Sequence, residues 1–323
     1  MAVRGKGASA KVGTVVIMLA MVSVPACPAV ASQSPGCGHP APARAPTSFV
    51  VGGIERQAIV VVPSGYRPDR PVPLVMAFHG RTNDNARLRR YLGLEEVAVA
   101  PAIFIYPAAR EAPGGGFTWA APGGKPDYTL FDGILAASGQ SYCIDRSAIF
   151  LVGHSLGATF ANDLACGRAH MVAGVGSVAG GITQGRCAGR VPALLLHNPR
   201  DELVPLSEGE KARDTLLGEP MPAAWPVAET LQGFACLRAG SNQAVLLWCL
   251  YRQDTTSRGR YYPHQWPEGA SRLIMSFFAE LSAPQATRRF LTQAAGATAL
   301  NSSQCRPTNG PPSCSSAALL SPP

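Results

Sequence analysis

The stretch AIFLVGHSLGATF, residues 148–160, decides the fold. It opens with five apolar residues, Ala148–Val152, whose composition suits a buried strand, and it ends in an apolar pattern typical of a helix. Between the two stands a Gly-x-Ser-x-Gly sequence centred on Ser155. Glycines two residues before and after a serine let the chain turn sharply from strand to helix, because bulkier side chains would clash there. The stretch therefore predicts a strand–turn–helix unit that lifts the Ser155 hydroxyl above the edge of a sheet.

Similar short apolar runs recur on both sides of this unit, bounded by Gly and Pro. Their lengths suit the buried strands of a mostly parallel sheet. The runs are 58–63, 73–78, 102–106, 148–152, 172–178, 193–197 and 245–250. Helical patterns lie between several of them, at 85–98, 130–139, 156–167, 207–217 and 269–281. This alternation predicts an α/β domain over residues 48–283, with a mostly parallel central sheet and helices on both faces.

The first thirty-one residues have the pattern of a secretory signal peptide. Positive charges at Arg4, Lys6 and Lys11 precede a mostly apolar run at 12–24, and small residues follow before a cleavage site ahead of Ser32. The apolar run is too short for a membrane span. We therefore expect a secreted or periplasmic protein. A loose match to a bacterial lipoprotein site at Cys27 leaves a lipid anchor as the less favoured alternative.

The segments flanking the predicted domain differ from it in composition. Residues 32–47 are rich in Pro, Ala and Ser and predict a linker, and residues 284–323 predict a flexible C-terminal extension. Cleavage after Ala31 leaves eight of the nine cysteines, an even number suited to disulfides in an oxidising compartment. The pairing stays open; bridges between nearest neighbours would be Cys166–Cys187, Cys236–Cys249 and Cys305–Cys314.

Charge and cysteine patterns argue against several classes of partner. Without the three leader cations, 25 Lys and Arg face 20 Asp and Glu, a net charge of +5, and the positive residues are scattered. We therefore expect no nucleic-acid partner. We also expect no metal site, because the sequence has no CxxC or His/Cys cluster at zinc spacing.

The partners of Ser155 follow from chain order, because this architecture places the acid and then the histidine after the nucleophile. Asp201 and Glu202 both follow the apolar run 193–197, where a carboxylate would lie on the same rim as the serine. Asp201 is favoured because it is nearer the strand. Of the six histidines, only His264 comes after this acid. The sequence therefore predicts Ser155 as nucleophile, Asp201 as orienting acid and His264 as general base.

Two backbone amides are expected to hold the oxyanion. One belongs to Arg81, which follows the strand-ending His79-Gly80, and the other to Leu156, directly after the nucleophile. Two tryptophans are candidates for substrate binding, because either ring could stack on an acyl group or a sugar. Trp119 lies in a Gly- and Pro-rich loop that we expect at the mouth of the cleft, and Trp266 stands beside the base. The alternative is that both rings only pack their loops.

Several motifs in one order resemble the polyhydroxybutyrate depolymerase / feruloyl esterase group of α/β-hydrolases, relatives of carbohydrate esterase family one. They are His79-Gly80 with Asn83 and Asn85, Tyr106-Pro107, Trp119, Phe131-Asp132, Gly-His-Ser-x-Gly, Cys166, Asp-x-x-Val-Pro and His-x-Trp-Pro. The resemblance covers roughly residues 50–282. It implies an extracellular ester hydrolase without a cofactor, and it carries nucleophile, acid and base to Ser155, Asp201 and His264.

The chain departs from the group at three places. Leu156 and Ala158 replace the Asn and the last Gly of the usual Gly-His-Ser-Asn-Gly-Gly turn. Tyr262-Pro263 stands where a pair of glycines usually precedes the base, and Arg81 puts a charged side chain beside the oxyanion donor. These changes leave the triad in place but put the substrate preference in doubt.

The sequence therefore predicts a secreted serine esterase that acts as a monomer on carboxylic esters. Hydroxyalkanoate oligomers, feruloyl esters and acetyl esters are the candidate substrates, and the substrate could be polymeric. A serine peptidase or acyltransferase on the same fold is the first alternative. The second is a non-catalytic member that binds a polymer, for which a broken triad would be the expected sign.

Overall fold

The computed structural model describes Met1 and residues 33–120, 127–219, 228–240 and 244–283. Residues 1–32 form a unit separate from the one that begins at Gln33, and only the second is described below. The predicted signal peptide, the lipid-anchor alternative at Cys27, the C-terminal extension and the Cys305–Cys314 bridge all lie outside the described residues.

A ten-stranded sheet runs through the described part of the chain, in the order β1-β2-β4-β3-β7-β8-β9-β12-β11-β10. The six strands from β4 to β12 are parallel, and antiparallel strands extend the sheet at both ends. A separate antiparallel pair is formed by β5 and β6. The strands are β1 (Ser48–Val51), β2 (Ile54–Val61), β3 (Val72–Phe78), β4 (Ile103–Pro107), β5 (Arg110–Glu111), β6 (Phe117–Thr118), β7 (Ile144–His154), β8 (Gly174–Val178), β9 (Ala193–His197), β10 (Ala228–Leu231), β11 (Phe234–Ala239) and β12 (Leu246–Leu250).

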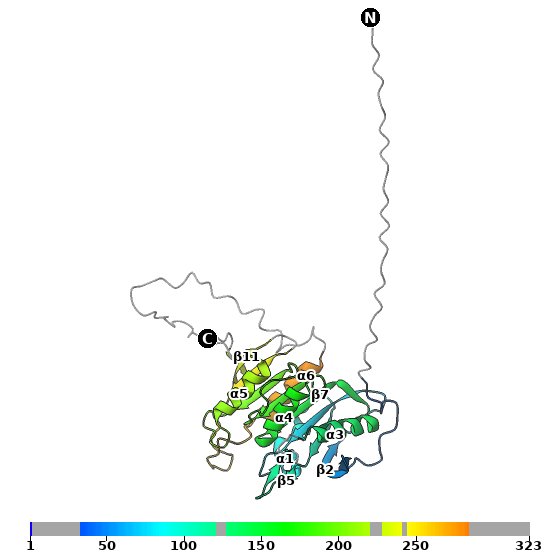
Figure 1. Ribbon diagram of the computed structural model, residues 1–323, viewed down its shortest axis with the longest axis horizontal. Coiled ribbons are helices and arrows are strands. Elements are labelled where there is room, and N and C mark those ends of the chain that lie inside the picture. The colour runs from blue at the N-terminus through cyan, green and yellow to red at the C-terminus, as the bar shows by residue number, and fades with distance from the viewer. Residues whose placement is uncertain (2–32, 121–126, 220–227, 241–243, 284–323) are drawn as a thin grey trace, which may run out of the picture. The chain divides into compact units, whose positions relative to one another are not determined.

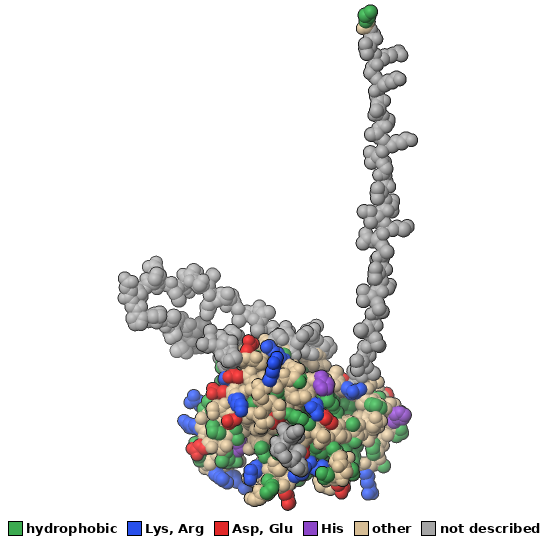
Figure 2. All heavy atoms as spheres, in the orientation of Figure 1, with side chains coloured by type: hydrophobic (Ala, Val, Ile, Leu, Met, Phe, Trp, Pro, Cys, Tyr) green, Lys and Arg blue, Asp and Glu red, His purple; other side chains and the backbone are tan. Residues whose placement is uncertain are grey.

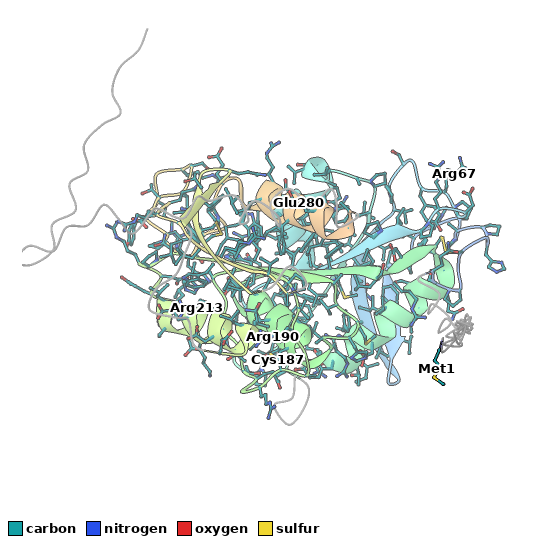
Figure 3. The ribbon with its side chains drawn as sticks, turned by 90° about the horizontal axis from the view of Figure 1, so that it is seen from above. Met1, Arg67, Cys187, Arg190, Arg213 and Glu280 are labelled. Carbon is teal, nitrogen blue, oxygen red and sulfur yellow. A yellow bond between two sulfur atoms is a disulfide. The ribbon has the colours of Figure 1, made fainter. Side chains whose placement is uncertain are left out.

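Helices cover both faces of this sheet. Helices α3, α4 and α5 pack on one face around Phe160, and α1, α2 and α6 pack on the other around Phe278. Seen from above, Arg213 of α5 and Glu280 of α6 mark the two opposite layers (Figure 3). The helices are α1 (Asn85–Leu92), α2 (Leu94–Val97), α3 (Tyr128–Ser141), α4 (Leu156–Gly167), α5 (Leu206–Leu217) and α6 (Ala270–Ser282). This arrangement is an α/β-hydrolase fold, as predicted.

The predicted elements correspond closely to the observed ones. All seven predicted strands are found, and β9 has the predicted bounds. The helix expected over 85–98 is two helices, because Gly93 takes a left-handed φ of 53° and its amide closes α1 by donating to the carbonyl of Arg89. Five strands were not predicted. Strands β1, β10 and β11 lie beyond the parallel part of the large sheet, and β5 and β6 form the separate pair.

The prediction of a linker over residues 32–47 is wrong for its first part. Cys37 forms a disulfide with Cys143, which is the residue before β7. The Ser34 hydroxyl donates to the carbonyl of Tyr142 at 2.6 Å. The same hydroxyl accepts from the amide of Ile144 at 2.8 Å. This segment is therefore fastened to the sheet. Of the bridges between nearest neighbours, Cys166–Cys187 and Cys236–Cys249 are present.

The described surface is mixed in charge. On the face seen in Figure 2, basic and acidic side chains are interspersed rather than gathered by sign. Among the described helices, none is both long and apolar enough to cross a membrane.

Candidate active site

The four predicted catalytic segments meet at one edge of the sheet. Ser155 directly follows β7, which runs through the middle of the sheet in Figure 1 beside α4. Gly80 follows β3, Asp201 follows β9 and His264 lies in the loop after β12. Since β3, β7, β9 and β12 are parallel, their carboxyl ends share that edge, which is where α/β sheets place their sites.

Ser155 sits on a strained turn. Its φ is 58° and its ψ is −125°, a conformation that non-glycine residues rarely adopt. The flanking glycines are required by contact. A Cβ on Gly153 would lie 2.3 Å from the carbonyl oxygen of Gly157, and one on Gly157 would lie 2.1 Å from the carbonyl oxygen of Phe78. The turn therefore packs against both α4 and the end of β3, and this packing holds the nucleophile in its strained position.

The acid and the base are in direct contact. The Nδ1 atom of His264 lies 2.6 Å from Oδ2 of Asp201, and both residues are about 5% exposed. The other carboxylate oxygen of Asp201 accepts from the amides of Leu203 at 2.9 Å and Val204 at 3.0 Å. Glu202, the competing acid, is exposed. The structure therefore pairs His264 with Asp201.

Burial alone would raise the pKa of the Asp201 carboxyl. The hydrogen bonds from His264 and from the amides of Val204 and Leu203 outweigh that effect, and the pKa of Asp201 lies below its ordinary value. The carboxylate therefore stays ionised and keeps Nδ1 of His264 protonated, which leaves Nε2 of His264 free to accept a proton.

The loop that carries His264 is tied to the end of β12. The hydroxyl of Tyr251 donates to the carbonyls of Pro263, at 3.3 Å, and Gln265, at 3.0 Å, on either side of the base. Tyr251 was not among the predicted site residues, because no local sequence pattern links it to a residue thirteen positions later. The nearest signal is its position, directly after the last parallel strand.

The predicted oxyanion segment lies against the nucleophile. A Cβ on Gly80 would come within 3.2 Å of the Cβ and 3.6 Å of the Oγ of Ser155, so the backbone leading to Arg81 passes beside the hydroxyl. The carbonyl of Arg81 accepts from the amide of Phe117 at 2.8 Å. The second predicted donor, Leu156, is the first residue of α4, where the helix dipole favours negative charge.

His79 fixes this segment through two hydrogen bonds. Its Nε2 accepts from the amide of Ala109 at 2.9 Å, and its Nδ1 lies 2.9 Å from the carbonyl oxygen of Gly80. Because that carbonyl can only accept, Nδ1 carries the proton of the neutral ring. Burial lowers the pKa of His79, which keeps the ring neutral.

The expectation that Trp119 faces the mouth of the cleft is wrong. The residue is 3% exposed, and its ring stacks on Phe160 with centroids 5.0 Å apart. Its Nε1 donates to the carbonyl of His79 at 2.8 Å. Trp119 therefore supports the strand end that leads to the oxyanion segment, which is the packing alternative for this residue.

Trp266 packs against His154, the residue before the nucleophile. Its ring meets His154 edge-on at 5.8 Å and its Nε1 donates to the hydroxyl of Ser271 at 3.0 Å. It lines a groove of about 850 Å³ between the end of α1 and the loops around β12 and α6, whose lining includes neither Ser155 nor His264. Trp266 could therefore meet a part of a substrate that extends into this groove.

Tyr262 is the aromatic residue found beside the base. Its ring is half-buried and lies 5.9 Å from that of His264, centroid to centroid, while the guanidinium of Arg260 lies 5.4 Å from the Tyr262 ring. Tyr262 was not among the predicted substrate-binding residues; in the sequence it stands out only because it replaces one of a pair of glycines. Among the described residues, no group of three or more His, Cys, Asp or Glu is placed to hold a metal ion.

Comparisons with known proteins find esterases. No family model matches the chain. Over 202 residues it is 28% identical to feruloyl esterase C of Emericella nidulans, a match covering 59% of the chain and 70% of that protein. Probable feruloyl esterase C of Aspergillus flavus is 30% identical over 190 residues, which cover 55% of the chain and 66% of the relative.

Solved esterase structures share the fold. An acetyl xylan esterase from Aspergillus awamori superposes with a TM-score of 0.50 at 14% identity, covering 69% of this chain and 94% of that one. A ferulic acid esterase superposes with a TM-score of 0.52 at 13% identity, covering 72% and 96%. The chain is therefore similar in sequence to feruloyl esterases, and the solved esterase structures share its α/β-hydrolase fold.

Proposed function

We propose that the protein hydrolyses carboxylic esters by acyl transfer through Ser155, with His264 as general base and Asp201 as its orienting acid. The observation that carries the proposal is the buried 2.6 Å contact between Nδ1 of His264 and Asp201, on the same sheet edge as the strained Ser155. An ionised acid, an oriented imidazole and a serine at a strand–helix turn are the parts that this chemistry needs.

In the acylation step, Nε2 of His264 takes the proton from Ser155 as Oγ attacks the ester carbonyl carbon. The carbonyl π electrons move to the oxygen, and the amides of Arg81 and Leu156 hold the resulting oxyanion. When the tetrahedral intermediate collapses, the bond to the alcohol oxygen breaks. His264 gives its proton to that oxygen, and the free alcohol and an acyl-Ser155 ester remain.

In the deacylation step, His264 removes a proton from water, and the hydroxide oxygen attacks the acyl carbon. The second tetrahedral intermediate expels Oγ of Ser155, which recovers its proton from His264, and the carboxylic acid leaves. Asp201 stays ionised throughout and stabilises the imidazolium that forms twice in each cycle. Removal of one oxyanion donor typically costs about 100-fold or more in turnover.

We propose aromatic acyl esters of the feruloyl type as the first substrates to test. The curated relatives are named feruloyl esterases, and the ring of Tyr262 beside the base offers a face on which an aromatic acyl group could pack. Acetyl esters and hydroxyalkanoate oligomers remain the other candidates. The three disulfides among the described residues support secretion or export to the periplasm.

The test compares p-nitrophenyl acetate, p-nitrophenyl butyrate, methyl ferulate and a hydroxybutyrate dimer, with wild type and Ser155→Ala. We expect ester hydrolysis by wild type and its loss by several orders of magnitude in the variant. A matching anilide and an alcohol acceptor distinguish the other two alternatives. A serine peptidase would hydrolyse the anilide as well as the ester, and an acyltransferase would transfer the acyl group to the alcohol faster than to water. Equal rates in wild type and variant would mean that Ser155 is not the nucleophile.

A further inference from the structure

His154, the residue before Ser155 in the Gly-x-Ser-x-Gly turn, has a side chain that the proposed chemistry leaves unused. The residue is 5% exposed. Its Nε2 lies 3.0 Å from the backbone carbonyl oxygen of His264, and its Nδ1 lies 2.9 Å from the hydroxyl oxygen of Tyr91 in α1. The residue next to the nucleophile therefore touches the backbone of the base, 110 positions later in the chain.

These two contacts select one tautomer of the imidazole. A backbone carbonyl can only accept a hydrogen bond, so Nε2 of His154 carries the proton and donates it to the carbonyl of His264. Nδ1 of a neutral ring is then an acceptor, and the Tyr91 hydroxyl donates to it. Burial raises the pKa of Tyr91, which keeps that hydroxyl protonated. Burial is the main reason that the pKa of His154 falls to about 3, and the proximity of His264 lowers it further. The ring of His154 is therefore neutral at physiological pH.

Aromatic rings enclose His154 on its other sides. The imidazoles of His154 and His264 stack with their centroids 5.3 Å apart and an interplanar angle of 27°. Tyr91 and Trp266 meet His154 edge-on, with centroids at 5.6 and 5.8 Å. Trp266 is itself fixed by Ser271 at the start of α6. Residues of α1, the base loop and α6 thus leave the His154 ring little freedom to turn.

We infer that His154 is a positioning residue for His264: its Nε2–H, oriented by the Tyr91 hydroxyl, holds the backbone of the base at a fixed height relative to Ser155. The inference rests on the proposed esterase chemistry. Because His154 directly precedes Ser155, one residue connects the nucleophile turn to the base loop, so neither can shift without the other. A misplacement of about 1 Å between reacting groups can cost about 100-fold in rate.

The test uses three variants and a count of competent active sites. His154→Phe keeps a ring of similar size but removes the donor, and His154→Gln restores a donor near the position of Nε2. His170→Phe changes an exposed histidine as a control. Turnover of p-nitrophenyl butyrate is divided by the number of serines that a fluorophosphonate titrates at complete reaction.

We expect His154→Phe to lower kcat per titrated site about tenfold or more with KM changed less than about twofold, and His154→Gln to recover most of the loss. His170→Phe should match wild type. If His154 only supported folding, His154→Phe would reduce the number of titrated sites and leave kcat per site unchanged, which would overturn the inference.

Tyr91→Phe gives a second test that keeps the packing and removes only the hydroxyl. Without the Tyr91 hydroxyl, nothing fixes the proton of His154 on Nε2 from the Nδ1 side of the ring. We therefore expect kcat per site to fall about threefold or more. The double variant Tyr91→Phe/His154→Phe should be no slower than His154→Phe alone, because Tyr91 acts through His154. If His154→Phe does not fold, Tyr91→Phe decides the matter.

The outcomes separate this inference from the proposed function. Wild-type turnover per site in both His154→Phe and Tyr91→Phe would overturn the inference and leave the esterase proposal intact. A wild-type protein that hydrolyses no ester and titrates with no fluorophosphonate would overturn the proposed function, and this inference with it.

Discussion

Replacement of Asp201 by Asn tests the orienting role of the acid with almost no change of shape. The side-chain oxygen Oδ1 accepts from the amides of Leu203 and Val204, so the Asn carbonyl oxygen must occupy that position. The Asn NH₂ group then lies where Oδ2 accepted from His264 at 2.6 Å. It faces the imidazole as a donor, and Nδ1 of His264 must lose its proton to accept from it.

The expected loss follows from this tautomer. A His264 that carries its proton on Nε2 cannot take the proton of Ser155, so acylation loses its general base. The same change of tautomer in a serine protease triad lowers kcat on the order of 10⁴-fold, which corresponds to about 5.4 kcal/mol of transition-state stabilisation. Substrate binding does not involve Asp201, so KM should stay within about twofold.

The assay is the initial rate of p-nitrophenyl butyrate hydrolysis by wild type, Asp201→Asn and Glu202→Gln. Glu202 is the exposed neighbouring acid, and its variant removes the same charge without touching the base. We expect Glu202→Gln to retain wild-type kcat. The reasoning is refuted if Asp201→Asn keeps more than about a tenth of wild-type kcat, because a loss of less than about tenfold could come from the change of charge alone.

Three further predictions address the turn, acid sensitivity and substrate preference. Gly157→Ala would place a Cβ 2.1 Å from the carbonyl oxygen of Phe78, so the free energy of unfolding in urea should fall by about 3 kcal/mol, whereas Gly185→Ala, which meets nothing within 4 Å, should leave it unchanged. Because the pKa of His154 lies near 3 in the folded protein and near 6.5 in the unfolded chain, only the unfolded chain takes up this proton between those values. Stability should therefore fall as the pH drops below about 6.5, by up to about 1.4 kcal/mol per pH unit, and urea titrations at pH 7 and 5 should show a shallower decline in His154→Gln. Tyr262→Leu should raise KM for methyl ferulate about threefold or more and leave KM for p-nitrophenyl acetate unchanged; an equal change for both would remove Tyr262 from acyl recognition.

Local sequence patterns were enough to predict the centre of the fold. The runs at 148–152, 172–178 and 193–197, which lie in or overlap β7, β8 and β9, are mostly apolar because both faces of the sheet are buried there. Such runs are readable without knowledge of tertiary contacts. The turn at Ser155 was predictable because nearby backbone atoms leave no room for a Cβ at either of its two glycines, so both appear in the sequence. Chain order then left His264 as the base, and its contact with Asp201 is present.

The features that could not be predicted from the sequence depend on contacts between residues far apart in the chain or lack a continuous apolar run. Residues 33–47 have the composition of a linker, yet Cys37 and Ser34 bind residues more than a hundred positions away. The β10–β11 hairpin is antiparallel and its β11 strand alternates buried and less buried residues, so it lacks the continuous apolar run that marked the central strands. Trp119 was expected at the mouth of the cleft because its stacking partner, Phe160, lies 41 positions later in α4 and no local pattern links the two.

The central claim is that Ser155 forms the covalent acyl intermediate. The most direct measurement is the reaction of wild type, Ser155→Ala and Asp201→Asn with a fluorophosphonate, followed by proteolysis and mass spectrometry. The account predicts one label per chain in wild type, located on Ser155, no label in Ser155→Ala and a much slower reaction in Asp201→Asn. A label on any other residue, or one that persists in Ser155→Ala, would contradict it.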